Sequence, residues 1–200
     1  MLVFVPDGPF RRVAGKLNPG AILTAFRDRL FRRYAFGYFG HMWELYAFWA
    51  FVPVMLAANK NYQHNNLHIS FWSFVIIASG GLACIIGGIL SQKTGAARIA
   101  VISLLLSCCC CLLSPFFLLI ESTPVLISFL LFWGLVVIAD SPMFSTLVAQ
   151  NAPQESRGTA LTIVNCIGFA ITIVSIRLVK LLSAHINARY VYLLLAVGPI

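Results

Sequence analysis

Charged residues are scarce in this chain. Asp, Glu, Lys and Arg make up only 10% of its 200 residues, whereas 60% are hydrophobic. A soluble globular domain carries about a quarter charged residues. The polar surface is too small to cover a water-soluble core, which excludes a soluble domain and predicts an integral membrane protein.

Enzyme signatures are also absent. The sequence contains no HExxH, no GxSxG, no Walker loop and no dinucleotide fingerprint. We therefore expect no catalytic residue, no metal and no cofactor, and rank a membrane-embedded enzyme third among the possible functions. His64 and His68 lie in a polar connection and are interpreted as solvated loop residues.

The sequence shows neither a disulfide framework nor a cleavable signal peptide. All six cysteines lie inside apolar runs, and the first apolar run is only four residues long before Pro6. The four consecutive cysteines 108–111 would fan out by about 100° each on a helix and could not converge on one metal. We interpret the cysteines as small apolar helix residues.

Acidic residues are the rarest charged type, which leaves a net charge of +8. Seven of the fourteen basic residues precede the first long apolar run, a pattern typical of a cytoplasmic juxtamembrane segment. This placement argues against a nucleic-acid groove and favours attraction to anionic lipid. We expect a multi-pass protein of the plasma (inner) membrane with a cytoplasmic N-terminus.

Long apolar runs are what the sequence does contain. A spanning helix needs about twenty apolar residues, and five runs qualify: 34–57, 69–90, 98–120, 124–149 and 158–182. A sixth run, 190–200, is too short to span, so we expect a truncated helix there. The predicted fold class is an all-α polytopic membrane protein. Its domains would be a basic linker (1–33), amphipathic near 21–31, and a transmembrane bundle (34–200).

Two of the six acids fall deep inside predicted spans. Glu44 lies near the middle of the first, one helical turn after His41, and Asp140 lies near the middle of the fourth. An intramembrane carboxylate marks an ion pathway, a proton relay or a substrate contact by default. The alternative is a neutral carboxyl that hydrogen-bonds a neighbouring helix. Pro142 is expected to kink the fourth helix near Asp140.

Small residues recur at helical spacing in the second span. Two stripes are formed, one by Gly80, Cys84 and Gly88 and the other by Ala83, Gly87 and Ser91. Small residues at this spacing allow helices to pack closely in lipid. Gly37 and Gly40 in the first span would likewise let a substrate or another helix approach closely.

The connection GGILSQKTGAAR resembles the loop signature of the major facilitator superfamily, G-x-x-x-D-[RK]-x-G-x-[RK]-[RK]. Gly88, Lys93, Gly95 and Arg98 match it, whereas Gln92 replaces the usual aspartate. In that family the acid and the basic residues of this gating loop help lock one conformation. The missing acid weakens that implication for this chain.

A second stretch, APQESRGTALTIVNCIGF, resembles the P-x-E-x-R-G cytoplasmic loop of the same family. Pro153, Glu155, Arg157 and Gly158 align with it. Glu155 would favour the positive N-terminus of the next helix. Gly158 is expected to let the chain turn.

The resemblance implies a place within a twelve-helix transporter. VPDGP and the basic stretch after it resemble the exit from helix six and the central linker, so the chain would be the C-terminal half, with helices seven to eleven and the start of twelve. In this family the substrate lies between two six-helix halves that rock around it. The N-terminal half or a second chain would then be required as a partner.

The leading hypothesis is a secondary active transporter, a symporter of a small solute that works by alternating access and is coupled to protons. Glu44 is the first candidate for the proton-carrying group, with His41 and Asp140 as further proton or substrate candidates. The alternative is a non-transporting membrane interaction protein or a non-functional transporter fragment. The expected partners are the lipid bilayer, a small-molecule solute, protons and the other half, but no nucleic acid.

Overall fold

The computed structural model describes residues 25–63 and 67–199, which are almost entirely helical. The expected basic linker lies mostly outside the described residues, as do VPDGP and His64. The long helices are α2 (Arg29–Gln63), α3 (Ile69–Thr94), α4 (Ala96–Phe117), α5 (Thr123–Ala139), α6 (Ser141–Asn151) and α7 (Arg157–Ser183). Shorter elements are η1 (Gln154–Ser156), α8 (Ala188–Val191) and η2 (Tyr192–Val197). The all-α fold class is confirmed.

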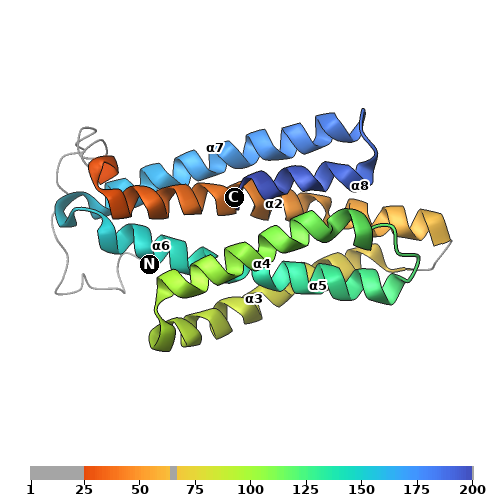
Figure 1. Ribbon diagram of the computed structural model, residues 1–200, viewed down its shortest axis with the longest axis horizontal. Coiled ribbons are helices and arrows are strands. Elements are labelled where there is room, and N and C mark those ends of the chain that lie inside the picture. The colour runs from red at the N-terminus through yellow and green to blue at the C-terminus, as the bar shows by residue number, and fades with distance from the viewer. Residues whose placement is uncertain (1–24, 64–66, 200) are drawn as a thin grey trace, which may run out of the picture.

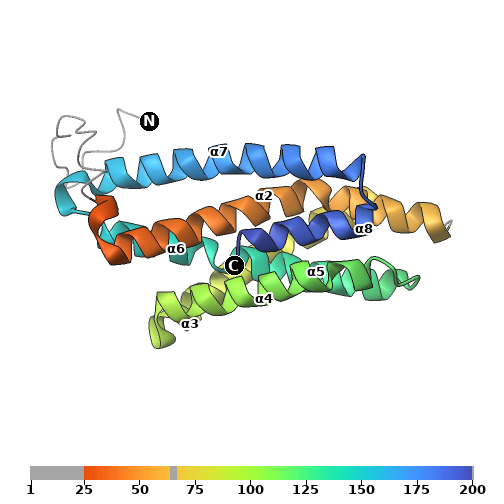
Figure 2. The ribbon, with the colours of Figure 1, turned by 45° about the horizontal axis from the view of Figure 1, so that its top comes forward.

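The helices run along the long axis of the molecule, and α2 lies between α7 and the group formed by α3, α4 and α5 (Figures 1 and 2). Successive passes run in opposite directions, and α5 and α6 together form one pass, Thr123–Asn151. The start of α2, residues 93–98 and residues 153–158 therefore meet at one end, which we call the motif end. The α4–α5 and α7–α8 connections lie at the opposite end.

Four helical segments are long and apolar enough to cross a membrane: Ile69–Thr94, Ala96–Phe117, Thr123–Asn151 and Gln154–Ser183. The first expected span differs from these. It lies within α2, which is 35 residues long and begins five residues before the expected start. His41 and Glu44 reduce its apolar character, so α2 is long enough to span but is more polar than the other four.

The fourth expected span is not one continuous helix. α5 ends at Ala139, Asp140 forms the junction, and α6 begins at Ser141 with a proline in its first turn. Pro142 has no backbone N–H and its fixed φ suits the first turn of a helix, so it starts α6 rather than bending the middle of a helix. The predicted disturbance at Pro142 is confirmed, and it is a helix break.

Within the last expected run, 190–200, residues 190–197 form the end of α8 and the 3₁₀ segment η2, and Ile200 lies outside the described residues. The end of this run crosses α2 at the Gly40–Gly198 contact, where a Cβ on either glycine would overlap the backbone oxygen of the other. Nearby, Trp43 donates its indole N–H to the carbonyl of Leu194 over 3.1 Å. Backbone contact between α2 and this segment is therefore close.

Small residues bring α3 and α5 together. A Cβ on Gly80 would overlap the side chain of Ile138, and one on Gly87 would lie 3.2 Å from the carbonyl oxygen of Ala139. α5 contributes Gly134, where a Cβ would lie 2.7 Å from the Ile76 carbonyl oxygen. Gly88 does not belong to this interface, because a Cβ there would meet nothing within 4 Å.

Gly134→Ala should destabilise the bundle. The added Cβ must push the α3 backbone away, and overpacking of this kind costs about 1–3 kcal/mol. Gly81→Ala is the matched control, because a Cβ at Gly81 meets nothing within 4 Å. Thermal unfolding in detergent should show a lower midpoint for Gly134→Ala and an unchanged or higher one for Gly81→Ala. Equal midpoints for the two variants would contradict the close α3–α5 contact.

Two hydrophobic clusters fill the bundle and follow one another along its long axis. The cluster towards the motif end includes Met42 and Met143, and the cluster towards the opposite end includes Leu45 and Ile138. Along α2 the boundary between them falls at 42–45, and across the α5–α6 break it falls at 138–143. The intramembrane polar residues lie at this boundary.

Candidate functional site

The carboxyl group of Glu44 is enclosed by hydrogen-bond donors from two other helices. Its Oε1 accepts from the indole N–H of Trp133 at 2.7 Å, from the thiol of Cys111 at 3.2 Å and from the hydroxyl of Ser107. Glu44 is only 1% exposed. Three donors on one oxygen supply what a buried carboxyl group loses when it leaves water.

The three donors are placed by ordinary helix geometry. Ser107 and Cys111 are four residues apart on α4, so their side chains lie one above the other on the face towards α2. Trp133 comes from α5 and packs its ring against Phe48 of α2, with centroids 4.7 Å apart. The indole N–H is thereby fixed towards the Glu44 carboxyl.

His41 and Asp140 form the second part of the site. Their Nδ1 and Oδ1 atoms lie 2.9 Å apart, and both side chains are buried. The contact has an ion-pair distance, but Oδ1 receives no well-aligned hydrogen bond. The other ring nitrogen, Nε2, is buried and has no hydrogen-bond partner among the described residues.

His41 connects the two carboxyl groups electrostatically. It interacts with Asp140 across the helix break and with Glu44 one turn along α2. The structure therefore brings all three sequence-predicted polar residues into one buried layer. A histidine between two carboxyl groups can hold a proton or pass one on.

The glycines beside this layer are used for packing. A Cβ on Gly37 would overlap the ring of Phe144, and Gly40 is covered by the Gly198 backbone. Of the two expected roles, close approach of another segment is the one observed. The Phe144 ring and the Gly198 backbone therefore close the site on the side of α2 that carries Gly37 and Gly40.

The gating-loop residues lie at the motif end, far from the buried layer. Lys93, Gly95 and Arg98 are exposed, and neither basic residue makes an ion pair within the part of the chain that the structure describes. Gly95 has φ +92°, a conformation that favours glycine, and it separates α3 from α4. Gly88 lies within α3.

The second loop motif spans the α6–α7 connection. Pro153 and Glu155 are exposed there, and Glu155 lies in η1, two residues before α7 begins at Arg157. The expectation for Gly158 is wrong, because this glycine is the second residue of α7 and does not turn the chain. The direction changes at 152–156, before the helix begins.

Sequence reasoning missed the three donors to Glu44. The interpretation of all cysteines as apolar helix residues is wrong for Cys111, which donates to a carboxyl oxygen. The available signal was the spacing of Ser103, Ser107 and Cys111, three small polar residues at i, i+4 and i+8 within an apolar helix. A tryptophan in a span also has an N–H that must find an acceptor.

Ser107→Ala should weaken the fold and the site together. A hydrogen bond within a protein contributes about 0.5–1.5 kcal/mol, and the alanine leaves Glu44 with two donors. Ser103→Ala is the control, since Ser103 lies one turn away on the same helix and does not contact Glu44. We expect a clearly lower thermal midpoint only for Ser107→Ala. A similar loss in both variants would show that the hydroxyl contact has no specific role.

Comparison with known protein families identifies the family of this chain. No curated protein shows significant similarity to this chain. The family model of the Major Facilitator Superfamily matches residues 1–197, nearly the whole sequence. The resemblance seen in the two loop motifs thus extends over all the long helices. The chain belongs to the Major Facilitator Superfamily and is an integral membrane protein of a transporter family.

Proposed function

We propose that this chain is the C-terminal half of a secondary active symporter, which moves a small solute together with protons by alternating access. The observation that carries the proposal is the enclosed Glu44 carboxyl beside the His41–Asp140 pair. Such residues inside a membrane are costly, and they commonly serve ion or substrate pathways. Membership in a transporter family supports the general function, and the buried layer supports proton coupling.

The hydrogen-bond geometry suggests where a proton would be held. Oε1 of Glu44 already accepts three hydrogen bonds, so an added proton is more easily placed on Oε2. The buried, unpartnered Nε2 of His41 offers a second position. Loading and release would alternate with rearrangement of α2 against α4 and α5, the helices that supply the donors.

The two loop motifs support the proposed position in the transporter. They lie at the same end of the bundle, as cytoplasmic loops of one half would. We place this end in the cytoplasm of a plasma (inner) membrane, where its exposed Lys93, Arg98 and Arg157 follow the positive-inside rule. The substrate would bind between this bundle and a six-helix N-terminal half, present in the same polypeptide or in a second chain.

A non-transporting membrane interaction protein is the second candidate, as is a non-functional fragment. The enclosure of all three polar residues inside the described bundle favours it, because buried polar groups also hold helices together. Reading the gene upstream of Met1 discriminates between the two. Six further spans in frame would support the transporter, and an isolated gene without a complementary half would support the interaction protein.

The proposed function can be tested by transport assays in proteoliposomes. The assembled transporter, meaning this chain with the half that completes it, is screened against small solutes with and without a pH gradient. We expect at least one solute to accumulate only when the gradient is present. Uptake of every transported solute that is independent of the gradient would contradict proton coupling.

A further inference from the structure

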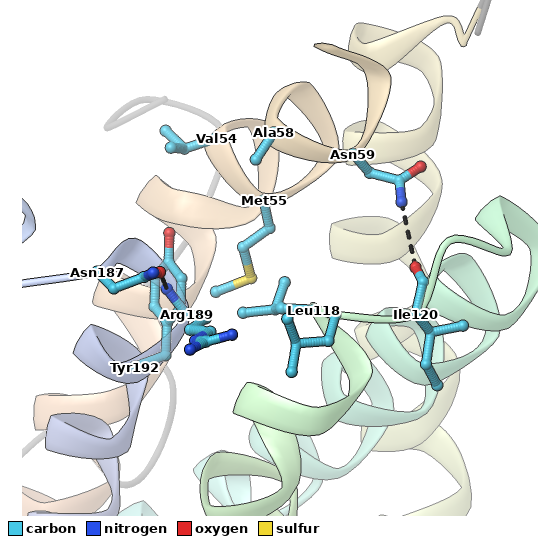
Figure 3. A pocket seen from close by; sticks show the side chains of 10 residues that line it. Val54, Met55, Ala58, Asn59, Leu118, Ile120, Asn187, Arg189 and Tyr192 are labelled. Carbon is cyan, nitrogen blue, oxygen red and sulfur yellow. Dashed lines mark hydrogen bonds between the residues drawn. The ribbon is translucent and has the colours of Figure 1, made fainter. Parts of the chain in front are cut away.

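A pocket of about 280 Å³ lies at the end of the bundle opposite the motif end (Figure 1), and Figure 3 shows the residues that line it. It is formed by the end of α2, the residues after α4 and the start of the last segment, with Met55, Leu118 and Tyr192 among its lining residues. Met55 follows Glu44 by eleven residues on α2, which corresponds to roughly 17 Å along the helix. The pocket is therefore separate from the buried polar layer.

Among the described residues that line the pocket, Arg189 is the only charged one. Its guanidinium carbon lies 4.6 Å from the centre of the Tyr190 ring, and its Nε is buried without a hydrogen-bond partner among the described residues. Figure 3 shows the guanidinium group beside Leu118 and Tyr192. A buried guanidinium N–H without an acceptor is costly, and a bound anion would supply one.

The two asparagines of the pocket are already engaged in hydrogen bonds. Asn59 donates to the carbonyl of Ile120 at 3.5 Å and accepts from Thr123 at 2.9 Å. Asn187 accepts from the backbone N–H of Arg189 at 3.3 Å. None of these contacts involves the guanidinium group of Arg189, so its positive charge is available to a ligand in the pocket.

The mouth of the pocket opens onto an apolar surface. Val54 and Leu119, which line it, are 49% and 55% exposed. In a membrane-spanning bundle, exposed aliphatic side chains of this kind face acyl chains. A ligand with an anionic head and an apolar tail would satisfy both parts of the pocket at once.

We propose that this pocket binds the anionic headgroup of an acidic phospholipid. The phosphate accepts from Arg189, and the first part of an acyl chain lies along Val54 and Leu119. The pocket volume of about 280 Å³ lies at the small end of the range for ligand sites, about 300–1,000 Å³, so the pocket can hold only part of a lipid. A lipid places only its head and part of one chain in the pocket, and the rest stays in the bilayer.

Native mass spectrometry of the full chain, released from detergent micelles, tests this assignment. The probes are dioleoylphosphatidylglycerol, dioleoylphosphatidylcholine and inorganic phosphate. The wild-type chain should prefer the anionic lipid over the zwitterionic one by roughly tenfold, because both phosphates can accept from Arg189 but the choline ammonium offsets the attraction of the zwitterionic headgroup to the guanidinium charge. Arg189→Gln should lose this preference, and Arg177→Gln should keep it, because Arg177 is exposed on α7 and does not line the pocket.

Leu119→Trp gives an independent test if Arg189→Gln does not fold. It alters an exposed lining residue, should fill the mouth of the pocket and should lower binding of the anionic lipid while Arg189 stays in place. Binding by Arg189→Gln or Leu119→Trp equal to wild type would overturn the proposal. Displacement of the lipid by inorganic phosphate at equal concentration would also overturn it, since the site would then bind the free anion.

Discussion

Glu44→Gln should abolish solute accumulation driven by a pH gradient and leave the helical bundle folded. The amide keeps the shape of the carboxyl, and its oxygen can still accept from Ser107, Cys111 and Trp133. What the variant loses is the ability to take up and release a proton. We expect gradient-driven accumulation to fall by roughly a hundredfold, within the range that a positioned proton-transfer group contributes.

Two comparisons separate the loss of proton coupling from a loss of folding. Exchange of labelled for unlabelled solute requires no net proton movement, so Glu44→Gln should retain it in the same proteoliposomes. Glu121→Gln makes the same chemical change at an exposed position and should retain both activities. Full gradient-driven accumulation by Glu44→Gln would refute the proposed role of Glu44.

The His41–Asp140 pair should show a strong thermodynamic coupling. His41→Leu leaves the Asp140 carboxyl buried without its partner, and breaking a buried pair in this way costs about 3–5 kcal/mol. Replacing both residues, as in His41→Leu/Asp140→Leu, removes the unpaired group, so much of the lost stability should return. Unfolding of all four proteins in mixed micelles completes the double-mutant cycle.

The double variant also separates stability from function. If the pair serves transport, the double variant is stable and does not accumulate solute. Additive effects of the two single changes on the free energy of unfolding would mean that the contact of His41 with Asp140 has no energetic weight. Wild-type accumulation by the stable double variant would assign the pair to packing.

The fold was largely predictable because apolar composition dominates it. Runs of about twenty apolar residues must form helices in lipid, where every backbone group needs an internal partner. The helix break at Asp140 could be predicted only in part, because Pro142 indicates a disturbance of the helix but does not determine whether the helix bends or ends and restarts. The extent of α2 was not visible either, since polar Arg29 and Arg33 continue a helix whose apolar part begins later.

Only the acidic residues and the histidine of the candidate site could be predicted from the sequence, and the residues that donate hydrogen bonds to Glu44 could not. Glu44, His41 and Asp140 stand out because a charged side chain in a span is rare. Their neighbours Ser107 and Trp133 are ordinary residues in sequence, and they meet Glu44 only because α4 and α5 pack against the same face of α2. Contacts over such sequence separations depend on tertiary packing, which no local pattern specifies.

The most direct test of the central claim is an infrared difference spectrum of the protein between acidic and alkaline pH. The claim is that Glu44 takes up and releases a proton. The wild-type spectrum should contain a band of a protonated, buried carboxyl that Glu121→Gln retains and Glu44→Gln lacks. A spectrum of Glu44→Gln identical to that of the wild type would contradict the claim.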